Sequence, residues 1–80
     1  MYRAITLYFL RNRIDWTKER QVEEALQNIE LEFIPNKISG KTEIYLNGEN
    51  VEYYIRDLIV AEKVSEIATI GSVRSFAVDQ

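Results

Sequence analysis

The side chains in this sequence that could bind a ligand are mainly arginines, since the 80 residues include neither His nor Cys. Their absence excludes a nucleophile paired with His and a zinc site built from the usual Cys and His ligands. Arg3, Arg56 and Arg74 each stand at the end of a predicted element, next to apolar residues. A guanidinium group binds phosphate and carboxylate groups through a planar fork. Each is therefore a candidate anion-binding residue, and the ordinary alternative is a surface arginine whose stem covers apolar neighbours.

The remaining polar residues indicate no catalytic chemistry. Gly40, Gly48 and Gly71 are isolated from one another, so the sequence contains no glycine-rich phosphate loop. The acidic residues fall on predicted exposed faces, where a solvated surface explains them. Ser65 lies in the middle of a predicted helix, where a serine is usually an exposed hydroxyl. From the residues alone we predict no catalytic residue and no metal-binding site.

Composition and charge narrow the class of protein further. The net charge is −3, and acidic and basic residues are interspersed, which leaves no basic face for nucleic acid. No apolar stretch approaches the roughly 18 residues of a membrane span. A length of 80 residues allows one small domain. The lack of Cys is in keeping with a cytoplasmic protein, which is the location that we expect.

Residues 1–13 form a predicted helix that would carry Arg3. Its apolar residues cover more than one stripe, a pattern typical of a helix buried inside a larger structure. No capping residue precedes it, which suggests a truncated start. We therefore expect a piece of a larger protein. The alternative is an independently folding interaction module that forms a homodimer through this exposed apolar helix.

Residues 18–28 form the second predicted helix, capped by Asp15 or Thr17. Its apolar residues recur with helical spacing and define one buried stripe. The members of this stripe are Val22, Ala25, Leu26 and Ile29.

Alternating apolar and polar residues then predict an antiparallel hairpin of strands 29–34 and 42–46, with Phe33 on its apolar face. The Asn47-Gly48 pair predicts a tight turn and a short third strand near residues 50–52. This sheet, about residues 29–52, is expected as an insertion between helices.

The C-terminal part would position Arg56, Ser65 and Arg74. Residues 53–56 are expected to form a turn of helix, and Asp57 to cap a helix over residues 58–69 with Leu58 on its apolar side. Gly71 is expected to end that helix in the left-handed conformation, and Ser72 to cap a last helix. The predicted class is α+β, in which helices pack with a small three-stranded antiparallel sheet as a single domain over residues 1–80.

In combination these residues resemble bacterial cytidylate kinase, the kinase that phosphorylates CMP and dCMP with ATP. The resemblance spans essentially the whole chain. It rests on Tyr2-Arg3, on the run from Ile44 through Tyr45, Leu46, Asn47, Gly48, Glu49 and Asn50 to Val51, and on Ile55-Arg56, Val60-Ala61, Val64-Ser65 and Ser72-Val73-Arg74. The resemblance implies that residues 1–80 are the region that binds the nucleoside monophosphate, together with its insert sheet.

The resemblance also implies a role for individual residues. Arg3 falls on the arginine that grips the CMP phosphate, and Ser65 and Arg74 fall on the pair that reads the cytosine base. Arg56 matches a recurrent arginine whose role the resemblance leaves open, with a structural link between insert and helix as one reading.

Other parts of such a kinase are absent from the sequence. The ATP-binding loop would precede Met1, the Gly-Arg-Asp segment would follow Gln80, and the lid arginines are missing. ATP and Mg²⁺ are therefore expected in the intact kinase and no cofactor in this piece, which should be inactive alone. Its expected partners are CMP or dCMP, bound no more tightly than about 1 mM, and the missing core and lid of the kinase.

Overall fold

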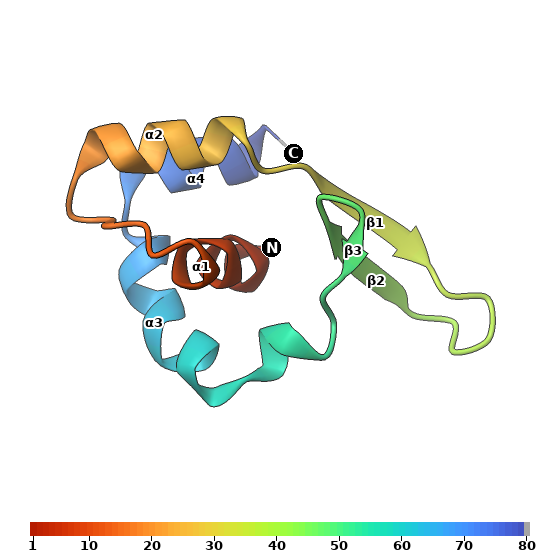
Figure 1. Cartoon of the computed structure of the whole chain (residues 1–80). Coiled ribbons are helices and arrows are strands. Elements are labelled where there is room, and N and C mark those ends of the chain that lie inside the picture. Colours follow the sequence, from red (N-terminus) through yellow and green to blue (C-terminus); the bar gives the residue numbers. More distant parts are fainter. Residues whose placement is uncertain (80) are drawn as a thin grey trace.

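Helix α1 (Tyr2–Arg11) forms the centre of the structure, a computed structural model that describes residues 1–79. Figure 1 shows it nearly end-on, with the other helices arranged around it. Ala4, Ile5 and Phe9 have no exposed surface, and the buried hydroxyl of Thr6 donates to the carbonyl of Tyr2 at 2.7 Å. The sequence correctly predicted a helix buried on nearly all sides. The helices that bury it belong to this same chain, so α1 does not present the exposed apolar face that a homodimer through it would need.

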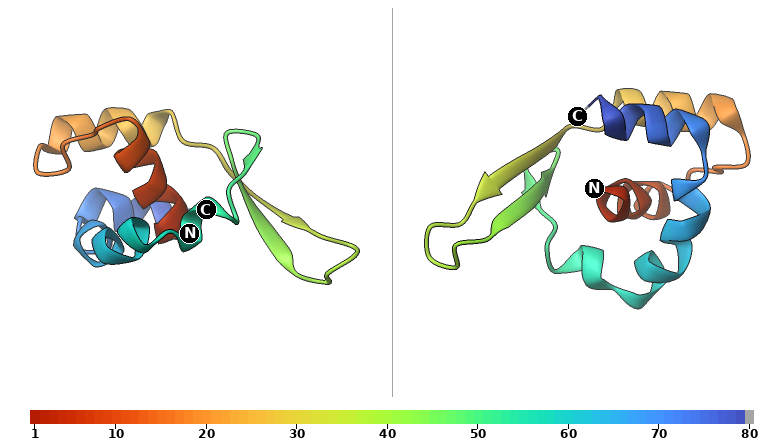
Figure 2. Two further views of the ribbon diagram at one scale, coloured as in Figure 1. Left: turned by 60° about the horizontal axis from the view of Figure 1, so that its bottom comes forward. Right: turned by 180° about the vertical axis from the view of Figure 1, so that it is seen from behind.

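Four further helical segments surround α1. They are α2 (Glu19–Gln27), the short 3₁₀ turn η1 (Tyr54–Arg56), α3 (Leu58–Ala68) and α4 (Gly71–Val78). Helix α1 packs against α3 and η1, while α2 and α4 pack against each other and lie above α1 in Figure 1 and in the right view of Figure 2. The predicted stripe of α2 faces this core, with Val22, Ala25 and Ile29 buried. Burial of these apolar residues is the main source of stability in so short a chain.

Helices α1 and α2 end in the same way. Asn12 and Asn28 are their C-cap residues, and each side chain donates to the carbonyl four residues earlier, at 2.9 and 3.0 Å. The start of α2 differs from the prediction, because its N-cap is Lys18, which makes no side-chain cap. Asp15 is engaged elsewhere, since its Oδ1 accepts from the N–H and the hydroxyl of Thr17. This local turn competes with the predicted cap.

The predicted three-stranded antiparallel sheet is confirmed, in the order β1 (Leu31–Pro35), β2 (Thr42–Leu46) and β3 (Glu49–Asn50). The register pairs Leu31 with Leu46 and Pro35 with Thr42. Figure 2 shows that the β1–β2 hairpin projects away from the helical body. Phe33 was expected on a covered face, yet 45% of it is exposed, because the outer half of the hairpin extends past the helices.

Residues after the sheet agree with the prediction in part. Asp57 caps α3, where its carboxylate accepts from the N–H of Ile59 at 3.1 Å. Leu58 was expected on the apolar side of α3 but is 71% exposed. It is the first residue of the helix, and the buried positions of α3 are Val60 and Ile67.

Two predictions about the break before α4 are wrong. Gly71 does not end α3 in the left-handed conformation, since α3 ends at Ala68 and Gly71 is the first residue of α4. Ser72 does not cap α4, because the N-cap position is held by Ile70, which is extended and makes no side-chain cap. The extended backbone of Ile70 turns the chain, so no left-handed glycine is required there.

Candidate ligand-binding site

Arg3 lies in the first turn of α1, exposed at the edge of the core. Its Nη1 donates to the carbonyl oxygen of Ile55, in η1, over a long distance of 3.5 Å. A guanidinium group has five N–H donors, so most of them remain available to a ligand. The positive end of the α1 dipole adds to the attraction for an anion at this end of the helix.

Arg56 belongs to the same region of the structure. It directly follows Ile55, so Arg3 contacts the peptide unit that precedes Arg56. Arg56 is exposed and lines a shallow depression of about 350 Å³ together with Tyr53 and Asp57. The fold therefore brings two of the predicted arginines, far apart in sequence, to one short turn.

The charges next to Arg3 affect the pKa of the Met1 amino group. Burial lowers the pKa of this amine, the Glu52 carboxylate acts in the opposite direction, and Arg3 lowers the pKa further. An acidic side chain thus lies on the same side of the core as Arg3 and offsets part of the positive charge there.

Ser65 and Arg74 lie on neighbouring helices, with Ser65 exposed on α3 and Arg74 exposed in the first turn of α4. Helices α3 and α4 pack together. Within residues 1–79 no hydrogen bond joins the two side chains. Arg74 lines its own depression of about 390 Å³, with Ser75, Val78 and Asp79. The fold presents both residues to solvent and does not join them in one enclosed pocket.

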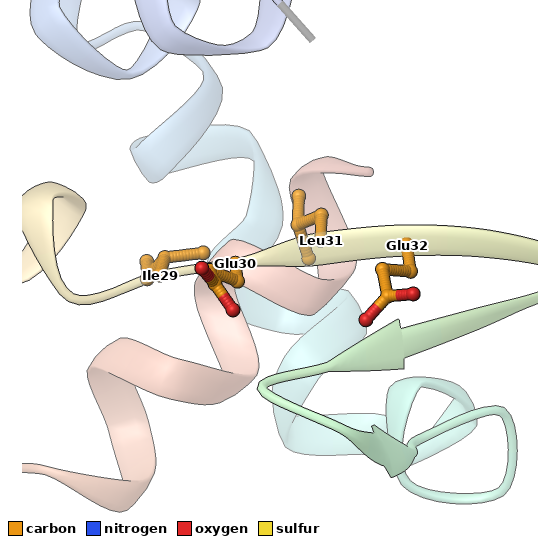
Figure 3. A pocket seen from close by; sticks show the side chains of 4 residues that line it. All are labelled: Ile29, Glu30, Leu31 and Glu32. Atoms are coloured by element: carbon orange, nitrogen blue, oxygen red, sulfur yellow. The ribbon is translucent and has the colours of Figure 1, made fainter.

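A third depression, of about 430 Å³, lies where the chain passes from α2 into β1. Figure 3 shows the four residues that line it, and the carboxylates of Glu30 and Glu32 point to the same side of the chain. Two carboxylates repel an anionic ligand. This depression is therefore a poor match for a phosphate, and none of the predicted residues contributes to it.

Sequence reasoning missed two residues that organise this region. Arg11, in the last turn of α1, forms an ion pair with Glu49 at 2.8 Å, and its guanidinium lies over the ring of Tyr54 at 4.7 Å. Asn47 bonds the β2–β3 turn to the α2–β1 connection. The Asn47-Gly48 pair did indicate a turn, but no local pattern indicated a partner for Arg11 so far along the chain.

Among residues 1–79, no group of three or more His, Cys, Asp or Glu side chains is placed to hold a metal ion. Over the same residues, every helix is too short or too polar to cross a bilayer.

The fold is a small α+β domain, in which a packed helical body carries exposed arginines and a projecting three-stranded sheet. A family model described as cytidylate kinase matches residues 1–80. The chain therefore belongs to the cytidylate kinase family.

Curated relatives agree with this assignment. The cytidylate kinase of Cytophaga hutchinsonii is 44% identical over 79 residues, which cover 99% of this chain and 34% of that protein. The cytidylate kinase of Bacteroides thetaiotaomicron is 42% identical over 83 residues, covering 100% of this chain and 36% of that protein. That of Onion yellows phytoplasma is 40% identical over 75 residues, covering 94% and 31%. The chain thus spans about a third of the length of these relatives. None of them supports the alternative of a separate dimerising module.

Proposed function

We propose that this chain is the part of a cytidylate kinase that recognises CMP or dCMP, with Arg3 on the phosphate and with Ser65 and Arg74 on the cytosine base. The observation that carries the proposal is the position of Arg3. Its guanidinium is exposed, it stands at the positive end of a buried helix, and it lies beside the turn that holds Arg56. A phosphate group there would meet fixed donors and a favourable helix dipole.

The base-reading part of the proposal depends on the chemistry of cytosine. The carbonyl and the ring nitrogen of cytosine accept hydrogen bonds, and its amino group donates them. The guanidinium of Arg74 can donate to the two acceptors, and the hydroxyl of Ser65 can serve either kind of group. The packing of α3 against α4 supports a fixed spacing between them.

The reaction of the whole kinase would be transfer of the γ-phosphoryl group of ATP to CMP or dCMP. ATP and Mg²⁺ would supply the phosphoryl group and neutralise its developing charge. In that reaction we assign to this chain the binding and orientation of the acceptor nucleotide, through Arg3, Ser65 and Arg74. We expect the isolated chain to be catalytically inactive and to bind CMP with a Kd of about 1 mM or weaker. We expect the kinase of which it is a part to be cytoplasmic.

A titration of the ¹⁵N-labelled chain, followed by NMR, tests the proposal in separate arms. Inorganic phosphate should shift amides near Arg3 and η1, cytidine should shift amides near Ser65 and Arg74, and CMP should shift both groups. Arg3→Met should abolish the phosphate shifts. Arg20→Met, which removes the same charge from α2, should leave them unchanged. The proposal is wrong if CMP at about 20 mM produces shifts only elsewhere or none at all.

A further inference from the structure

Arg11 connects three elements that are distant in sequence. Its Nη1 and Nη2 donate to the two carboxylate oxygens of Glu49 at 2.8 and 3.3 Å. The same guanidinium lies 4.7 Å from the ring centroid of Tyr54. Arg11 belongs to α1, Glu49 to β3 and Tyr54 to η1. One side chain therefore ties the projecting sheet and the 3₁₀ turn to the central helix.

Helix α1 contacts the 3₁₀ turn η1 through a second arginine. Arg3, in the first turn of the helix, donates to the carbonyl of Ile55, and Arg11, in the last turn, covers the ring of Tyr54. Tyr54 and Ile55 are adjacent residues of η1, and Arg56 completes it. An arginine at each end of α1 thus contacts η1, whose Ile55 is also buried in the core. A shift of η1 would move Arg56 and the acceptor that orients Arg3.

We propose that Arg11 is a positioning residue, which holds η1 and the sheet against α1 so that Arg3 and Arg56 converge on the phosphate of a nucleoside monophosphate. This inference rests on the proposed function. The two parallel hydrogen bonds to Glu49 require a planar guanidinium, which a lysine cannot supply. The ion pair is partly exposed, at 36% and 50% of the two side chains, so it contributes little to global stability. In this proposal the Arg11–Glu49 pair acts by fixing the position of η1 and of the sheet relative to α1.

Variants of Glu49 can distinguish a charge effect of Arg11 from a positioning effect, because Glu49 is the ion-pair partner of Arg11. If Arg11 acted only through its positive charge, Glu49→Gln would strengthen phosphate binding by removing a nearby negative charge. If Arg11 acts by position, Glu49→Gln removes the charged, bidentate partner, leaves a single neutral acceptor and weakens binding, in the same direction as Arg11→Met. Arg11→Lys keeps the charge and loses the fork, so positioning predicts that it fails to restore binding.

The experiment measures the Kd of phosphate, CMP and cytidine by NMR, together with the ring-proton shifts of Tyr54. Arg11→Met should weaken phosphate and CMP binding by about threefold to tenfold, the range expected for an exposed ion pair with a cation–π contact. Cytidine binding should not change. The Tyr54 ring signals should move, and Arg11→Met with Glu49→Gln should be no weaker than Arg11→Met alone. Arg20→Met is the matched control, which should change neither quantity.

Four other outcomes would contradict the role of Arg11 or the proposed function. If the wild-type chain binds phosphate and Arg11→Met binds it equally well, the role of Arg11 is wrong and the proposed function stands. Stronger binding by Glu49→Gln, or full rescue by Arg11→Lys, shows a charge effect and also contradicts positioning. Equal loss of phosphate and cytidine binding with a lower unfolding midpoint shows a merely structural role. A wild-type chain that binds neither phosphate nor CMP removes both proposals.

Discussion

Asn47 and Glu30 are joined by two hydrogen bonds at the base of the projecting hairpin. The backbone N–H of Glu30 donates to the Asn47 side-chain oxygen at 2.7 Å, and the N–H of Asn47 donates to the Glu30 carbonyl at 2.8 Å. The side-chain amide of Asn47 also donates to the carbonyl of Asn28 at 3.0 Å. Asn47 and Gly48 both have positive φ, of 50° and 84°, as a tight hairpin turn requires. One residue therefore shapes the turn and fastens it to the end of α2.

Asn47→Gly and Asn47→Ala should separate these two contributions of Asn47. Glycine keeps the left-handed backbone but loses the side-chain hydrogen bonds, so the free energy of unfolding should fall by about 1–2 kcal/mol. Alanine loses the same bonds and adds the left-handed penalty, which costs about 1 kcal/mol more. Urea unfolding followed by circular dichroism measures both. An unchanged midpoint in the glycine variant would show that the side-chain bonds contribute nothing to stability.

Gly71→Ala should stabilise the chain, because Gly71 is the first residue of α4 and does not have a positive φ. A Cβ at this position would meet no atom within 4 Å. The gain should be about 0.4–1 kcal/mol, mainly from the lower entropy of the unfolded chain. Gly48→Ala is the opposite control, because a φ of +84° makes alanine unfavourable there. Thermal unfolding compares them, and a destabilised Gly71→Ala would restore the left-handed helix end that the sequence predicted.

Stability should fall in acid partly because of Asp15. The hydroxyl and the N–H of Thr17 donate to its carboxylate and lower the pKa of Asp15. A carboxyl group with a lower pKa in the folded state stabilises the fold fully above its unfolded pKa of about 4. That contribution is lost as the pH falls through the folded pKa. Asp15→Asn should therefore show a smaller decline of the urea midpoint between pH 7 and about pH 2.5, and parallel curves for the two proteins would exclude this role.

Under the proposed function, Arg74→Met introduced into this region of a full-length cytidylate kinase should raise the KM for CMP without changing the KM for ATP. Loss of a charge-assisted hydrogen bond of about 1.5–3 kcal/mol predicts a reduction of kcat/KM for CMP of one to two decades. Ser65→Ala should act in the same direction and more weakly, because a neutral hydrogen bond is weaker. Steady-state kinetics with each substrate varied in turn checks this. A matching loss for ATP would indicate a general structural defect.

Arg20→Met serves as the control for that measurement, because Arg20 is an exposed residue of α2 outside the proposed site. It should leave both KM values unchanged. If it raises the KM for CMP as much as Arg74→Met does, the effect reflects the net charge of the protein, and the base-reading role of Arg74 must be abandoned.

The sequence by itself determined the class of fold and most of the elements, because these depend on local patterns, and its resemblance along the whole chain indicated the family. The apolar stripe of α2, the Asn47-Gly48 turn and the cap at Asp57 are each encoded within a few residues. Local patterns were less reliable where two of them compete, as at Asp15 and Gly71. There the choice between a cap, an Asx-type turn and an extended residue involves small differences in free energy.

The tertiary structure alone decided what surrounds α1 and which arginines meet. The apolar sequence of α1 required burial, but only the packing of α3, η1 and the other helices showed that this chain provides the cover. The contacts of Arg3 with Ile55 and of Arg11 with Glu49 span 52 and 38 positions. Such contacts follow from the path of the whole backbone, because residues this far apart have no common local period that could reveal them.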